Sequence, residues 1–161
     1  MNRYVRHVFI LPEDDCDRQI ANGFVDHDQV KTPRVQVVDP AGGWAEVLKT
    51  FRTEYIATLR QFSLGYLVML VDFDGVCATR LPDFENAIPA DLIDRVFVVG
   101  AKITPEALKQ ALGKTLEQIG RSLADDCYKG TTAVWGHEHL KHNDSHRSRL
   151  IQFVKPILFN E

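Results

Sequence analysis

Two aspartates one residue apart, Asp72 and Asp74, directly follow the apolar run of residues 66–71, and Gly75 comes next. In a β-strand, residues at i and i+2 point to the same side, so the two carboxylates converge if the extended backbone continues through them. Carboxylates that lie close together repel each other unless a cation or a proton lies between them. The spacing therefore predicts a divalent metal site.

A second acidic group follows the apolar residues 4–11 and consists of Glu13, Asp14, Asp15 and Asp17. Asp14 or Asp15 can cap a helix that begins here, and acidic side chains favour the positive N-terminus of a helix. Four acids in five residues exceed what capping requires. If the two apolar runs form neighbouring parallel strands, both groups lie at one edge of the sheet. Glu13, Asp72 and Asp74 would then form one site of oxygen ligands, which Mg²⁺ and Mn²⁺ prefer. The alternative is that these acids have separate capping and solvated roles.

The elements that must position these acids alternate between strand-like and helix-like segments. Strands are predicted at residues 4–11, 34–38, 66–71 and 95–99. Helices are predicted at residues 15–25, 44–62 and from 107 to about 127. Residues 76–89 contain two prolines and predict a loop or a broken segment, and residues 150–159 a helix, a strand or both. The order predicts an α/β fold, an open and mostly parallel sheet of four to five strands flanked by helices, with a C-terminal helical extension.

Composition limits the function classes. The length of 161 residues suits one domain, and the net charge of -3 argues against an overall basic surface for nucleic acid. A local basic patch or a partner subunit would have to supply positive charge. No apolar run approaches the roughly 18 residues that a membrane span needs. The three cysteines (Cys16, Cys77 and Cys127) are widely spaced, which is typical of reduced thiols in a cytoplasmic protein.

The order of these motifs resembles a known family. The apolar strand that ends in Glu13, with Asp17 four residues later, is similar to the first motif of Toprim domains, in the form found in overcoming-lysogenization-defect (OLD) nucleases. Residues 35–43, which end in Gly42 and Gly43, resemble the second strand and glycine turn of that group. Residues 70–74 resemble the Toprim DxD motif. Pro12 and Asp14 depart from the usual Val and Gly, and the basic residue that these nucleases often carry has no evident counterpart.

The resemblance implies a Toprim-like core at about residues 5–112 and an extension at about 113–161. It implies that Asp72 and Asp74 ligate Mg²⁺ or Mn²⁺ and that Glu13 is a ligand or the general acid/base. Asp17 would hold a second ion, and Glu106 would complete that second site unless it only complements a helix dipole. The expected activity is metal-dependent cleavage of nucleic acid, DNA in preference to RNA, in defence or DNA processing. The chain lacks a Gly-x4-Gly-Lys-Ser/Thr loop, so a nucleotide-driven step would need an ATPase partner.

Two other functions stay open. A Toprim-like chain without its own activity would be a subunit or interaction module of a larger complex. Residues 70–76 also resemble the first motif of haloacid dehalogenase-like phosphatases, in which Asp72 would be the nucleophile and Asp74 the general acid/base. That family carries the motif on its first strand, whereas two β-α units precede it here, which favours the metal-ligand interpretation.

A group of histidines lies near the C-terminus. His139, His142 and His146 would share one face of a helix, as zinc ligands do. However, His137 and His142 are five residues apart, so the segment lacks the HExxH spacing, and no cysteine is nearby in the sequence. We therefore predict a polar surface helix or loop for this segment.

Overall fold

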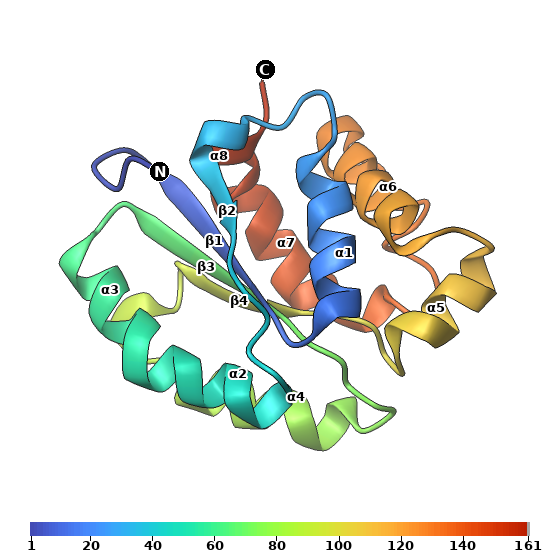
Figure 1. Ribbon diagram of the computed structural model, residues 1–161, viewed down its shortest axis with the longest axis horizontal. Coiled ribbons are helices and arrows are strands. Elements are labelled where there is room, and N and C mark those ends of the chain that lie inside the picture. The colour runs from blue at the N-terminus through green and yellow to red at the C-terminus, as the bar shows by residue number, and fades with distance from the viewer. Residues whose placement is uncertain (161) are drawn as a thin grey trace.

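Four parallel strands form a single sheet in the order β2-β1-β3-β4 (Figure 1). The computed structural model describes residues 1–160. The strands are β1 (His7–Pro12), β2 (Val35–Val37), β3 (Gly65–Leu70) and β4 (Val96–Val99). β1 and β3 are central neighbours, with Val8 opposite Tyr66 and Pro12 opposite Leu70. The predicted α/β fold with a parallel sheet is confirmed, as is the neighbouring position of the two strands that precede the acidic groups.

Helices cover both faces of this sheet (Figure 1). One layer consists of α1 (Asp15–Val25), α5 (Pro105–Leu112), α6 (Leu116–Lys129), α7 (Asp144–Phe153) and α8 (Lys155–Leu158). The other consists of α2 (Trp44–Thr50), a π-helical turn (Phe51–Tyr55), α3 (Ile56–Gln61) and α4 (Cys77–Ala87). Short 3-10 turns complete the chain at Thr32–Arg34, Ala90–Leu92 and Lys141–Asn143. Within residues 1–160, no helix is long and apolar enough to cross a membrane.

Burial on both faces explains the continuous apolar runs of the strands. Successive residues of β1 point to opposite faces, so Val8 and Ile10 contact the layer that contains α1. Phe9 and Leu11 contact the layer that contains α2. Each face has its own core, and both cores bury strand residues almost completely.

The predicted loop at residues 76–89 and the predicted single helix from 107 to about 127 were both wrong. Residues 76–89 are mostly the helix α4, although Pro82 lies inside it. Complete burial of Phe84 supplies the packing that outweighs the one backbone hydrogen bond lost at Pro82. The predicted helix from 107 to about 127 is two helices, because Gly113 adopts a left-handed conformation with φ +62° and ends α5. Thr115 then caps α6.

Glycines allow α1 and α6 to pack closely. A Cβ atom on Gly23 would lie 2.0 Å from the carbonyl oxygen of Glu117, and one on Gly120 would lie 1.9 Å from that of Ile20. Both distances are far shorter than any van der Waals contact, so this approach requires glycine at both positions. The contact holds α1, whose first turn carries Asp17, against the rest of its layer.

The His-rich segment covers the outer edge of β4, contrary to the prediction of a polar surface. The backbone N–H of Gly100 donates to Asn143 Oδ1 (3.0 Å), and Asn143 Nδ2 donates to the carbonyl oxygen of Gly100 (3.0 Å). The N–H of Val98 donates to Nδ1 of His146 (3.1 Å), and burial lowers the pKa of that imidazole, which favours the neutral, accepting form. Asn143 and His146 are each 3% exposed. These side chains form hydrogen bonds with backbone groups that would otherwise be unpaired at an edge strand.

Asn143→Ala tests this edge. The change removes the partner of the Gly100 N–H, while the Gly100 carbonyl keeps its contact with His142 Nε2 (2.7 Å). An unpaired buried polar group costs about 1–3 kcal/mol. We expect the free energy of unfolding, measured by urea denaturation, to fall by about 2–3 kcal/mol. Asn86→Ala, on the exposed surface of α4, is the matched control and should change stability little. Equal effects of the two substitutions would contradict the assigned role.

Candidate metal centre

Four carboxylates meet at the C-terminal ends of the two central strands. Glu13, Asp14, Asp17 and Asp72 each offer one oxygen, and these oxygens all lie within 4.8 Å of one another. Glu13 directly follows β1, Asp14 and Asp17 belong to the start of α1, and Asp72 follows β3 by two residues. We call these four residues the acidic cluster. Within residues 1–160 it is the one grouping of three or more acidic, His or Cys side chains with this geometry.

Backbone hydrogen bonds hold Glu13 in place. The N–H of Asp72 donates to Glu13 Oε2 (3.0 Å), which joins the ends of β1 and β3 through a side chain. The N–H groups of Gly42 and Gly43 donate to the carbonyl oxygen of Glu13 (2.9 and 3.2 Å). Their φ angles of +97° and +138° are conformations that favour glycine. The Gly-Gly turn therefore supports Glu13, and its two N–H groups are occupied by this contact.

The acids at the start of α1 have different roles. Asp14 caps the helix, since its Oδ1 accepts from the N–H of Asp17 (3.0 Å), and it also belongs to the acidic cluster. Asp15 points away and pairs with Arg18 at the surface. The capping role predicted for this segment is thus confirmed for Asp14, and Asp15 is a solvated acid.

Asp17 is the most unusual member of the cluster. Its side chain is 0% exposed, and neither carboxylate oxygen has a hydrogen-bond partner among residues 1–160. Asp72 Oδ1 is also buried without a partner. Burial raises the pKa of Asp17 to about 12 and that of Asp72 to about 8, and it raises the pKa of Glu13 as well. Without a cation, protons must neutralise this group, because a buried unpaired carboxylate is strongly disfavoured.

Asp74 lies outside the acidic cluster. Its φ of +48° ends the extended backbone that the convergence of Asp72 and Asp74 would need. Its carboxylate pairs with Arg80 of α4, whose guanidinium stacks on Trp44 at 4.6 Å and donates to the carbonyl oxygen of Asp72 (3.1 Å). Sequence reasoning missed Arg80, because residues 76–89 were predicted to be irregular. Recognition of α4 would have placed Arg80 one turn into a helix beside the DxD motif.

Glu106 also lies outside the acidic cluster. It is exposed in the first turn of α5, where its Oε1 accepts a hydrogen bond from the Cys16 thiol (3.1 Å). This contact raises the pKa of Cys16 to about 12, so the thiol is not a reactive thiolate. The structure therefore brings together Glu13, Asp17 and Asp72 of the predicted ligands, adds Asp14, and leaves Asp74 and Glu106 apart.

The donor set fits a hard divalent cation. All its ligand atoms are carboxylate oxygens, which Mg²⁺ and Mn²⁺ prefer. The unpartnered oxygens of Asp17 and Asp72 are the specific observation that supports this fit.

Asp17→Asn should stabilise the metal-free protein at alkaline pH. The pKa of Asp17 is higher in the folded protein than its ordinary value of 3.8, so its contribution to stability is complete below that pH and is lost as the pH rises. The amide avoids this loss. We expect unfolding free energy in EDTA at pH 8 to increase by roughly 2–4 kcal/mol and to change much less at pH 4. Asp15→Asn, with an exposed acid on the same helix, is the control and should show no gain; a gain there too would contradict the assignment.

A second test uses the metal itself. Millimolar Mg²⁺ or Mn²⁺ should raise the melting temperature of the wild type more at pH 8.5 than at pH 6.5, because the metal competes with the protons of Asp17 and Asp72. Differential scanning fluorimetry measures the shift. Asp72→Asn should remove most of it. An equal shift in that variant would place the binding elsewhere.

Comparison with known proteins gives no family for the chain. No protein-family model matches it, and neither a curated protein nor a solved structure is significantly similar to it.

Proposed function

We propose that the protein binds Mg²⁺ or Mn²⁺ through Glu13, Asp17 and Asp72 and hydrolyses phosphodiester bonds of nucleic acid, DNA in preference to RNA. The observation that carries this proposal is Asp17, a fully buried carboxylate whose oxygens lack partners and face three other acids. Such an arrangement costs stability when its carboxylates are ionised, unless a bound cation compensates their charge.

The position of the cluster supports a ligand site. In open α/β sheets, ligands bind in the crevice beyond the carboxyl ends of the strands. Glu13 and Asp72 extend from those ends of the two central strands, β1 and β3. A metal ion held there would polarise a phosphoryl oxygen and lower the pKa of a bound water.

Each carboxylate of the site would have its own role. Asp17 and Asp72 would hold the cation, and Asp14 would add negative charge while it fixes the start of α1. Glu13, held by the N–H of Asp72, would be a third ligand or the general acid/base. Asp74, held by Arg80, lies at the rim and contributes to the shape of the DxD turn. Any step driven by ATP would require a partner subunit, in a defence or DNA-processing assembly.

The phosphatase alternative has less support. As a nucleophile, Asp72 would attack an anionic phosphate while it is surrounded by three further acids, and its acid/base partner Asp74 is paired with Arg80. Asp126 of α6, which is also buried, accepts hydrogen bonds from Thr131 Oγ1 and from the N–H groups of Val134 and Trp135. Asp126 therefore has a structural role.

The decisive experiment incubates the protein with supercoiled plasmid, single-stranded DNA and RNA, in Mg²⁺, Mn²⁺ or EDTA. We expect nicking or degradation with metal and none with EDTA. Glu13→Gln and Asp72→Asn should each reduce the rate by at least about 100-fold, the size of effect typical of a lost acid/base group or metal ligand. Asp15→Asn is the control and should retain the wild-type rate.

Other outcomes would overturn the proposal in defined ways. Metal-dependent release of phosphate from small esters without cleavage of nucleic acid would favour the phosphatase. Metal-dependent stabilisation with no hydrolysis of any substrate would favour a non-catalytic module. Cleavage that persists in both variants would show a contaminating nuclease.

A further inference from the structure

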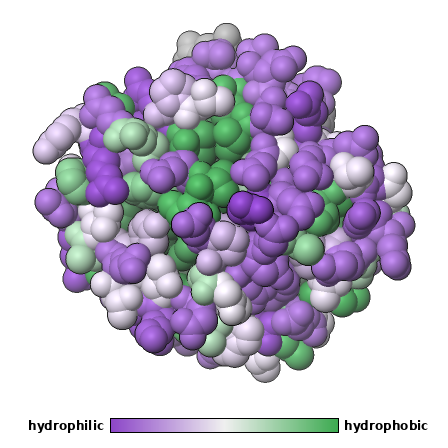
Figure 2. Space-filling view, viewed as in Figure 1, coloured by the Kyte–Doolittle hydropathy of each residue, from purple (hydrophilic) through white to green (hydrophobic). Residues whose placement is uncertain are grey.

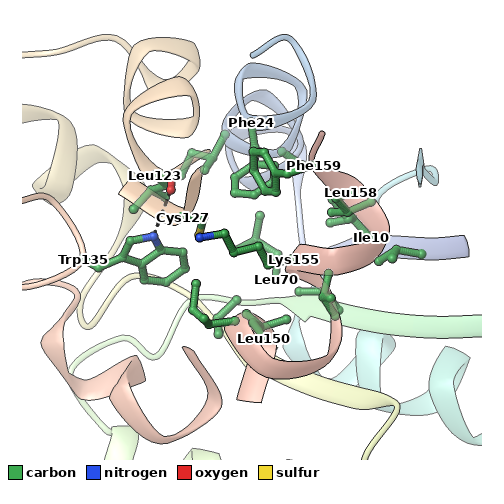
Figure 3. A pocket seen from close by; sticks show the side chains of 17 residues that line it. Ile10, Phe24, Leu70, Leu123, Cys127, Trp135, Leu150, Lys155, Leu158 and Phe159 are labelled. Carbon is green, nitrogen blue, oxygen red and sulfur yellow. Dashed lines mark hydrogen bonds between the residues drawn. The ribbon is translucent and has the colours of Figure 1, made fainter. Parts of the chain in front are cut away.

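A second candidate site lies in the core beneath the helical layer that contains α1. A cavity of about 80 Å³ is bounded by β1, β3 and β4 and by α1, α6, α7 and α8 (Figure 3). Its walls are almost entirely apolar, with Ile10 and Leu70 from the sheet and Phe24 and Leu158 from the helices. Figure 2 shows apolar side chains gathered on the surface between α8 and α1, over this region. The cavity is separate from the acidic cluster, because no cluster residue lines it.

Lys155 is the one charged residue in this lining. Its side chain extends from α8 past Leu70 toward Cys127 and Trp135 (Figure 3). Within residues 1–160, no carboxylate lies within 4.0 Å of its ammonium group. The other strong polar group in the lining is already used, since the indole N–H of Trp135 donates to the carbonyl oxygen of Leu123 (3.1 Å). An ammonium group at an apolar cavity, with no carboxylate partner, complements an anionic head on an apolar tail.

The size of the cavity limits the tail. An engineered cavity of about 150 Å³ accommodates benzene, so about half that volume suits a short unbranched chain rather than a ring. We propose that this cavity binds a small free carboxylic acid with a short alkyl chain, which lies against the sheet while its carboxylate pairs with Lys155. The proposal does not depend on the metal centre.

Tryptophan fluorescence provides the test. Trp135 lines the cavity and Trp44 lies on the opposite face of the sheet, so the Trp44→Phe variant reports from Trp135 alone. Butanoate should produce a saturable change in emission, and butanol and butylammonium are the matched neutral and cationic probes. We expect butanoate to bind at least about tenfold more tightly than butylammonium, which is the gain from a charge-assisted contact. Propanoate should bind about fourfold more weakly than butanoate, which is the contribution of one buried methylene.

Substitutions of Lys155 decide the role of the charge. Lys155→Met should weaken butanoate to the affinity of butanol and leave butanol unchanged, whereas Lys155→Arg should retain the preference for the acid. If the methionine variant does not fold, the arginine variant and the three-probe comparison still test the proposal. The absence of a saturable response to butanoate would overturn it. Equal affinity for butanoate and butylammonium, or unchanged butanoate binding in a folded Lys155→Met, would also overturn it.

Discussion

The parallel pairing of β1 with β3 determines where the chemistry of this molecule can lie. Because Pro12 is opposite Leu70, the residues that follow each strand arrive at the same place, and the N–H of Asp72 bonds to the Glu13 carboxylate. The helix α1 begins just after β1 and brings Asp17 to the same place. The close glycine contact with α6 holds this helix in position. The acidic cluster is thus a consequence of strand register. A slip of one residue would turn Glu13 or Asp72 to the other face of the sheet.

This arrangement opposes stability, and the rest of the fold has to offset it. Buried carboxylates without partners are costly, and the cluster contains two residues with such oxygens. The two cores, one on each face of the sheet, bury large apolar side chains such as Phe9 and Phe97 almost completely and supply the opposing free energy. A fold that served only as a scaffold would gain by replacing Asp17 with an apolar residue. The proposed cation site would account for its presence.

The sequence contained enough information for the fold class and for part of the site. Apolar runs followed by acids located β1 and β3, and the topology rules for α/β proteins placed Glu13 and Asp72 together. The position of Asp74 was not predictable in this way, because it depends on a left-handed backbone at a non-glycine residue and on an arginine in a helix that prolines concealed. The burial of His146 and Asn143 was also missed, since polar residues alone do not indicate that they will pair with the edge of a strand distant in sequence. Local patterns predicted elements well, whereas contacts between distant polar groups required the tertiary structure.

The treatment of the two sheet edges has a consequence for the behaviour of the protein at high concentration. Exposed edge strands pair with strands of other molecules and so promote aggregation. Here His146 and Asn143 accept hydrogen bonds from the backbone N–H groups of Val98 in β4 and of Gly100 just after it. The opposite edge is the three-residue strand β2, which offers few unpaired backbone groups. The side chains that seal β4 thus protect the folded chain from intermolecular β-pairing. Partial unfolding of the C-terminal helices would remove that protection before the central strands separate.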